Sequence, residues 1–109
     1  MLLEDTSEGD CLVVSLQEKR LDAVIAPSFR EALVERIDQG RHNIVLDMAQ
    51  VNFMDSSGLG AVVAVLKHLG GKGRLHICGV TPAVMAVLKL TRMDRVLKTF
   101  ETRQAAIAA

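Results

Sequence analysis

The stretch IVLDMAQVNFMDSSGLG, residues 44–60, decides the fold class of this chain. It begins with an apolar run, residues 44–48, that has the length of a buried strand, and it ends in the polar turn 55–60. Beyond that turn, apolar residues recur at helical spacing: Leu59, Val62, Val63, Leu66 and Leu69. Two hydroxyls and a carboxylate are therefore expected at a helix N-terminus, where free backbone N–H groups and the positive end of the helix dipole lie.

Strand and helix patterns alternate along the rest of the chain. Strands are expected at Cys11–Leu16, at Arg74–Cys78 and at residues 96–100. Helices are expected to start at Pro27 and Pro82, with Thr81 as a possible cap, and residues 104–109 could form a short last helix. This order predicts one α/β domain over residues 1–109, with a mostly parallel sheet of roughly four or five strands, about four crossover helices and an antiparallel edge.

Composition narrows the classes of function. The formal net charge of the 109 residues is zero, and there are 3 phenylalanines but no tryptophan or tyrosine, so neither nucleic acid nor a membrane surface is expected as a partner. An acidic N-terminus unlike a signal peptide predicts a cytoplasmic protein. The cysteines, Cys11 and Cys78, show no metal-ligand spacing and are expected to be buried free thiols, so no metal or cofactor is predicted.

No catalytic constellation is recognisable in the sequence. A nucleophile elbow requires a glycine two positions before its serine, and Met54 occupies that place before Ser56. The histidines, His42, His68 and His76, fall in an expected turn, helix and strand. The chain is therefore not expected to be an enzyme, and no catalytic residue is assigned.

Ser56 has a simple structural interpretation and a functional one. A serine at a helix start is most often an N-cap, whose oxygen accepts a backbone N–H bond and contributes about 1 kcal/mol. Here, however, Asp55 and Ser57 stand beside it, and a single cap would suffice. Gly58 and Gly60 also leave the backbone bare, so that a partner could approach closely.

These segments together resemble the anti-sigma factor antagonist family, the anti-anti-sigma factors, which consist of a single STAS domain. The resemblance covers nearly the whole chain and rests on an intact Asp-Ser-Ser-Gly-Leu-Gly motif. Its residues are Leu21-Asp22, Ile44-Val45-Leu46-Asp47, Phe53-Met54-Asp55-Ser56-Ser57-Gly58-Leu59-Gly60 and Val80-Thr81-Pro82-Ala83-Val84. Lys19 and Arg92 depart from the family pattern, which usually has glycine at the first position and a small residue at the second.

The resemblance implies a partner switch. In this scheme the unphosphorylated domain binds an anti-sigma factor, a serine protein kinase with an ATPase-type fold, and so frees the client of that kinase. The kinase then phosphorylates Ser56, the complex dissociates, and a serine phosphatase resets the domain. The partner-binding residues carried over by the resemblance, or expected beside the motif, are Asp22, Asp55, Ser57, Gly58, Leu59 and Val62, with Val24, Ile25 and Val63 as further candidates.

Two other functions remain open at this point. The same fold serves as a ligand-binding or scaffold module that is not phosphorylated. A receiver-like domain, which would accept phosphate on Asp55 or Asp47, is a second alternative. It would need an acidic pair and a lysine at strand ends, and Asp10 and Asp22 do not supply that pair.

Overall fold

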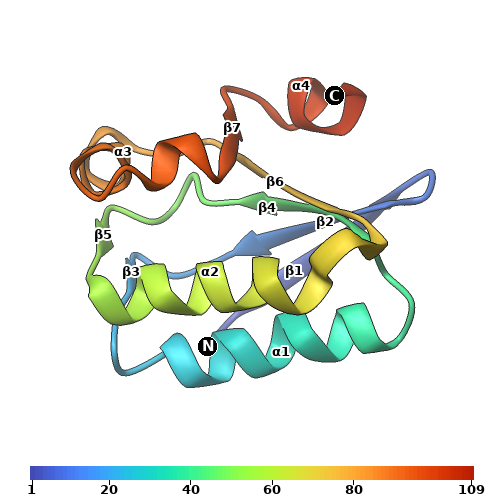
Figure 1. Cartoon of the computed structure of the whole chain (residues 1–109), viewed down its shortest axis with the longest axis horizontal. Coiled ribbons are helices and arrows are strands. Elements are labelled where there is room, and N and C mark those ends of the chain that lie inside the picture. Colours follow the sequence, from blue (N-terminus) through green and yellow to red (C-terminus); the bar gives the residue numbers. More distant parts are fainter.

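The structure, a computed structural model, describes residues 1–109 and consists of a sheet with helices on both faces (Figure 1). In chain order the elements are β1 (Leu3–Glu8), β2 (Cys11–Leu16), β3 (Arg20–Leu21), α1 (Ala26–Asp38), β4 (Asn43–Asp47), β5 (Phe53–Met54), α2 (Ser56–Leu69), the 3-10 helix η1 (Gly70–Lys72), β6 (Arg74–Cys78), α3 (Pro82–Leu90), the 3-10 helix η2 (Met93–Arg95), β7 (Lys98–Phe100) and α4 (Arg103–Ala108).

The main sheet has five strands in the order β1-β2-β4-β6-β7. All neighbouring pairs are parallel except β1 and β2, which form an antiparallel edge. The predicted α/β class, with a mostly parallel sheet, is thus confirmed. A second sheet, in which β3 pairs with β5, was not expected. Strands of two residues are too short to leave a periodic pattern in a sequence.

The hydrophobic clusters on the two faces of the sheet differ greatly in size. Alternate residues of β2 point to opposite faces, so Leu12, Val14 and Leu16 join the large core cluster of 22 residues beneath α1 and α2. Val13 belongs instead to a cluster of 5 residues on the other face, where Ala106 of α4 covers it. The large core is formed by Phe29, Leu33, Leu46, Leu69 and Ile77 among others.

Three polar contacts attach α4 to the second face. The Arg103 Nε donates to Asp47 Oδ2 at 2.6 Å, and the ion pair raises the pKa of Arg103, chiefly through that hydrogen bond. His76, which is 5% exposed, bonds the Ala106 carbonyl through Nδ1 at 3.1 Å. Arg74 donates to the carbonyl oxygen of Ala109. These bonds matter because a six-residue helix has little stability of its own.

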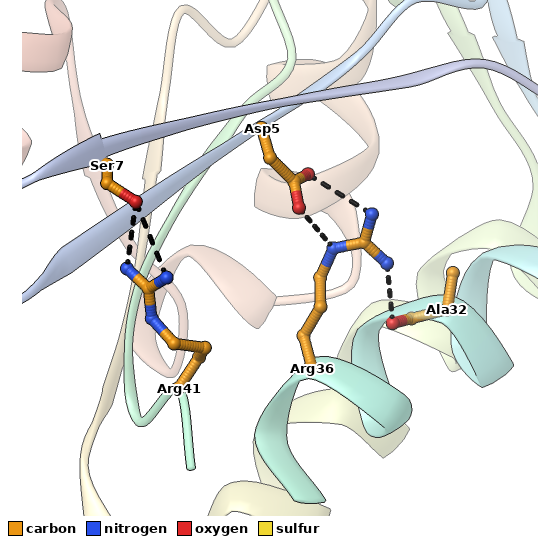
Figure 2. Close-up of polar contacts among 5 residues, drawn as sticks. All are labelled: Asp5, Ser7, Ala32, Arg36 and Arg41. Carbon is orange, nitrogen blue, oxygen red and sulfur yellow. Dashed lines mark hydrogen bonds and ion pairs between the residues drawn. The ribbon is translucent and has the colours of Figure 1, made fainter. Parts of the chain in front are cut away.

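Two arginines hold the edge strand β1, Arg36 from α1 and Arg41 from the loop that follows α1 (Figure 2). Arg36 donates from Nε and Nη2 to the two carboxylate oxygens of Asp5, at 2.9 and 3.1 Å, and from Nη1 to the Ala32 carbonyl. Arg41 reaches the Ser7 hydroxyl from two nitrogens, at 3.4 and 3.3 Å. The exposed charges of β1 also protect this sheet edge from pairing with another chain.

The residues that begin and follow α3 depart from simple expectations. Thr81 does not cap the helix, because its hydroxyl donates to the Val51 carbonyl at 2.7 Å instead. After α3, Arg92 has φ 61° and is the one residue other than glycine with a positive φ. A side chain in this left-handed conformation costs on the order of 1 kcal/mol.

We expect Cys78 to be inert in the folded protein. Burial raises the pKa of its thiol to about 11, with the charge of Asp47 adding to the effect. The thiol should therefore not react with a disulfide reagent at pH 8 until the chain unfolds.

The same pKa shift makes stability depend on pH. The thiol loses its proton near pH 8.5 in the unfolded chain but only near pH 11 in the native protein, so the free energy of unfolding should fall as the pH rises from about 8.5 to about 11. Thiol titration and denaturant unfolding at several pH values measure both effects, and rapid labelling of native Cys78 would contradict the expectation.

Candidate functional site

The site is built on the small sheet that β3 and β5 form. Arg20 pairs with Phe53 and Leu21 with Met54, and the Asn52 N–H donates to the Lys19 carbonyl at 2.9 Å. The Arg20 guanidinium also lies over the Phe53 ring, 4.0 Å from its centroid. This pairing brings the loop of residues 22–25, which leads into α1, against the N-terminus of α2.

Asp55 joins this loop to α2. Its Oδ1 accepts the Gly58 N–H at 2.9 Å and thereby caps α2, while its Oδ2 accepts the Ala23 N–H at 3.2 Å. The cap of α2 is therefore Asp55, and the interpretation of Ser56 as the cap is wrong. An aspartate accepts such bonds at least as well as a serine, and its two oxygens can serve two donors at once.

Both serine hydroxyls are consequently free. Ser56 and Ser57 are the first residues of α2, both are exposed, and no atom of the chain hydrogen-bonds either hydroxyl. They face different grooves: Ser57 lines one between α1 and α2, and Ser56 lines another together with Thr91 and Met93. Two adjacent nucleophilic hydroxyls thus lie at a helix N-terminus without a structural task.

Asp22 contributes a permanent negative charge to the neighbouring loop. Its carboxylate accepts a hydrogen bond from Arg20 Nε at 3.2 Å and another from the Val24 N–H at 3.1 Å. These contacts, that of Arg20 above all, lower the pKa of Asp22 below its usual value. The site therefore keeps its charge throughout the neutral pH range.

The family described as STAS domain matches residues 3–106. This chain belongs to the STAS domain family. Among STAS relatives, the anti-sigma-B factor antagonist of Staphylococcus epidermidis is 32% identical over 74% of this chain and 76% of that protein.

Solved STAS structures share the fold. An anti-sigma factor antagonist from Mycobacterium paratuberculosis superposes with a TM-score of 0.88 at 23% identity, covering 98% of this chain and 91% of that one. The Bacillus cell fate determinant SpoIIAA, in its phosphorylated form, gives a TM-score of 0.72 at 23% identity over 98% and 97% of the two chains. At these identities the likeness concerns the architecture alone.

The STAS fold separates the sequence-predicted site residues into two groups. Asp22, Asp55, Ser56, Ser57 and Leu59 lie at or near the surface. Gly58 and Val62 are buried, so neither presents a side chain to a partner, and Gly58 lies against the Leu21 carbonyl. The bare backbone at Gly58 therefore serves internal packing.

The loop and the helix faces around the motif add apolar surface. Val24 is 83% exposed, and Ile25 and Val63 are partly exposed. Sequence reasoning missed Arg20 and gave no role to the Phe53 side chain, although Phe53 lies in the segment that carries the family resemblance. The contact between these two residues could not be predicted, since it depends on the pairing of two very short strands.

The other chemically active side chains lie in structural roles. His68 bonds Asp38 at 2.7 Å and so links the ends of α1 and α2, and His76 is buried beneath α4. Side chains of the metal-binding types do not gather in threes anywhere in the chain, and none of its helices has the length and apolarity to span a bilayer.

Proposed function

We propose that this protein is an anti-sigma factor antagonist that acts by partner switching, with Ser56 as the phosphorylated residue. The observation that carries the proposal is that the residue capping α2, Asp55, is not the residue proposed to be phosphorylated, Ser56. Because Asp55 caps the helix, the Ser56 hydroxyl is exposed and unbonded, and modification of it costs the fold no hydrogen bond. The names of the relatives, including the staphylococcal anti-sigma-B factor antagonist, support the same assignment.

Phosphorylation would change the charge of this surface sharply. A phosphoserine adds about −1.5 to −2 charges, next to Asp55 and near the loop that carries Asp22. Two unit charges roughly 5 Å apart repel by about 3 kcal/mol at an effective dielectric of 20, and solvent screening reduces this value. A partner that covers this surface removes the solvent that screens these charges, so their repulsion is stronger in the complex than in the free domain. A difference of about 2.7 kcal/mol, to which lost contacts with the partner also contribute, corresponds to a hundredfold change in affinity and is enough to release the partner.

The fold itself is expected to tolerate the phosphate. The helix dipole favours an anion at the N-terminus of α2 by roughly 0.3 to 1 kcal/mol. Asp55 retains its two backbone donors, because neither comes from Ser56. The switch is therefore a change of surface, and backbone chemical-shift changes spread throughout the sheet would contradict it.

The partner in this proposal is an anti-sigma factor that is also a serine kinase with an ATPase-type fold, and a phosphatase resets the domain. The docking surface is formed by exposed and partly exposed residues around the motif. They are Asp22, Val24, Ile25, Asp55, Ser56, Ser57, Leu59 and Val63. Buried Gly58 and Val62 hold this surface in shape from beneath.

A receiver-like mechanism finds less support. Asp55 already accepts two backbone N–H bonds, and Asp47 is bonded to Arg103 and to the Ala49 N–H. Neither carboxylate is a free acceptor at an open strand end. The unphosphorylated scaffold therefore serves as the main alternative outcome of the test.

The test is a comparison of immobilised wild-type, Ser56→Ala and Ser56→Asp domains as baits for binding partners in lysate of the source cells. We expect an ATPase-type kinase to bind wild type and Ser56→Ala, and its recombinant form to bind Ser56→Asp about a hundredfold more weakly. Incubation with ATP should place the phosphate on Ser56, which peptide mass spectrometry can locate.

Ser57 supplies the matched control, because it is an equally free hydroxyl one residue away. Ser57→Ala should still be phosphorylated by the recombinant kinase, whereas Ser56→Ala should not. If all baits retain the same proteins, or none, the switch is refuted and the scaffold function is favoured.

A further inference from the structure

The end of α3 and the turn that follows it form an exposed basic and apolar projection, residues 89–96, which we call the knuckle. Leu90 is 87% exposed and Val96 is 51% exposed, which places Leu90 level with Val24 as the most exposed large apolar side chains of the chain. Lys89, Arg92 and Arg95 are exposed as well. The knuckle therefore combines two features, uncovered apolar area and positive charge, that favour contact with another molecule.

The positive charges of the knuckle have no partners inside the molecule. The four ion pairs of the protein involve Arg20, Arg36, His68 and Arg103, and none comes from the knuckle. Its single acidic residue is Asp94, against Lys89, Arg92 and Arg95. Although the whole chain is neutral, this segment is thus a locally basic surface.

The knuckle is also ordered in an unfavourable conformation. Backbone hydrogen bonds from Arg92 to Lys89, from Arg95 to Arg92 and from Val96 to Met93 close it into consecutive tight turns. Within these turns Arg92 has the left-handed backbone that glycine adopts without strain. Because this backbone conformation favours glycine, the presence of an arginine suggests that its side chain has a function.

The knuckle adjoins the site of Ser56. The groove beside Ser56 is lined by Ser56, Leu59 and Val63 from α2 and by Thr91 and Met93 from the knuckle. In Figure 1, α3 and η2 lie at the same end of the molecule as β5 and the start of α2, and α3 contacts β5. One partner can therefore cover both the Ser56 surface and the knuckle.

We infer that the knuckle is a second half of the docking surface and binds an acidic patch of the ATPase-type kinase, with Arg92 setting the specificity for that partner. The inference rests on the proposed function, which supplies the partner. Apolar contacts of Leu90 and Val96 contribute affinity, while the unpaired cations steer association and reject partners with a basic surface. The groove lined by Ser56 and Thr91 joins the two halves.

The test uses the recombinant kinase recovered on the Ser56→Ala bait and measures its affinity for the full-length chain. Arg92→Gly should weaken binding about tenfold and reduce its dependence on salt, while the melting temperature stays equal or rises because glycine fits this backbone. Leu90→Ser should weaken binding as well. Lys72→Ala removes an exposed cation at the far end of α2 and should change neither quantity.

The outcomes separate the knuckle from the Ser56 switch. If Ser56→Asp abolishes binding but Arg92→Gly binds like wild type, the partner switch is supported and the docking role of the knuckle is overturned. If Arg92→Gly weakens binding but Ser56→Asp does not, the docking role of the knuckle is supported and the partner switch is refuted. Failure to recover any kinase overturns both.

A lipid surface is the competing partner for a basic and apolar projection. Wild type and Arg92→Gly are therefore also sedimented with vesicles of phosphatidylcholine and phosphatidylserine. If wild type binds these vesicles and Arg92→Gly does not, while the two bind the kinase with the same affinity, the knuckle is a membrane-binding surface. That result would overturn the inference.

Discussion

Replacing Gly58 with alanine is expected to lower the free energy of unfolding by about 3 kcal/mol. A β-carbon at this position would overlap the carbonyl oxygen of Leu21 and lie 2.9 Å from its carbon. That oxygen belongs to β3, and it also accepts the Asp55 N–H at 3.4 Å. Neither the backbone of α2 nor that of β3 can move away without breaking the pairing of β3 with β5. The loss of stability therefore affects the whole site.

The effect should extend from stability to binding. If α2 moves away from β3, Asp55 cannot hold both Gly58 and Ala23, and the loop of residues 22–25 loses its anchor. We therefore expect weaker kinase binding even under conditions in which Gly58→Ala remains folded. Denaturant unfolding and titration with the recombinant kinase measure the two effects separately.

Gly60 provides a control in the same helix. A β-carbon there would meet no atom within 4 Å, so Gly60→Ala should be neutral or should stabilise α2 by roughly 0.5 to 1 kcal/mol. Equal stability changes for the two alanine variants would show that the close approach of Gly58 to Leu21 is unimportant.

Arg103→Ala is the second change with a large expected effect, a loss of about 2 kcal/mol. The Asp47 side chain is 11% exposed, and Arg103 is its only cationic partner. Without the guanidinium, the carboxylate keeps only the Ala49 N–H as a donor within the chain. The helix α4 loses its principal polar attachment at the same time.

A double-mutant cycle isolates this ion pair. Asp47→Asn removes the uncompensated charge, so Arg103→Ala combined with Asp47→Asn should be less destabilised than the sum of the single variants. Labelling of Cys78 gives an independent readout, because displacement of α4 uncovers the smaller core cluster to which this thiol belongs. Gln104→Ala, an exposed change on the same helix, should stay within about 0.5 kcal/mol of wild type. Additive single variants would show that the pair contributes little.

Asp55 performs two structural tasks beside the residue of the proposed switch. One carboxylate caps α2 and fixes the loop that carries Val24, so the Ser56 hydroxyl beside it needs no structural bond. The partner surface is thereby held in place by groups that phosphorylation leaves unmodified. This arrangement explains why charge on Ser56 is expected to change affinity without changing the fold.

The sequence by itself determined the fold class, the burial of both cysteines and the position of the turn that begins α2. Each of these follows from local patterns: the apolar strand runs that contain Cys11 and Cys78, the apolar run before the turn, the helical spacing from Leu59 to Leu69, and the polar motif between them. The sheet order and the parallel crossovers agree with that expectation.

Only the tertiary structure decided which residue does what at the site. Asp55 caps α2 through the Gly58 N–H, but its second bond, from the Ala23 N–H, joins it to a loop residue 32 positions away in the chain. The burial of Gly58 depends on Leu21, and the attachment of α4 depends on the meeting of Asp47 with Arg103. Such contacts join segments that are distant in sequence, and their energies are set by geometry that no periodicity records.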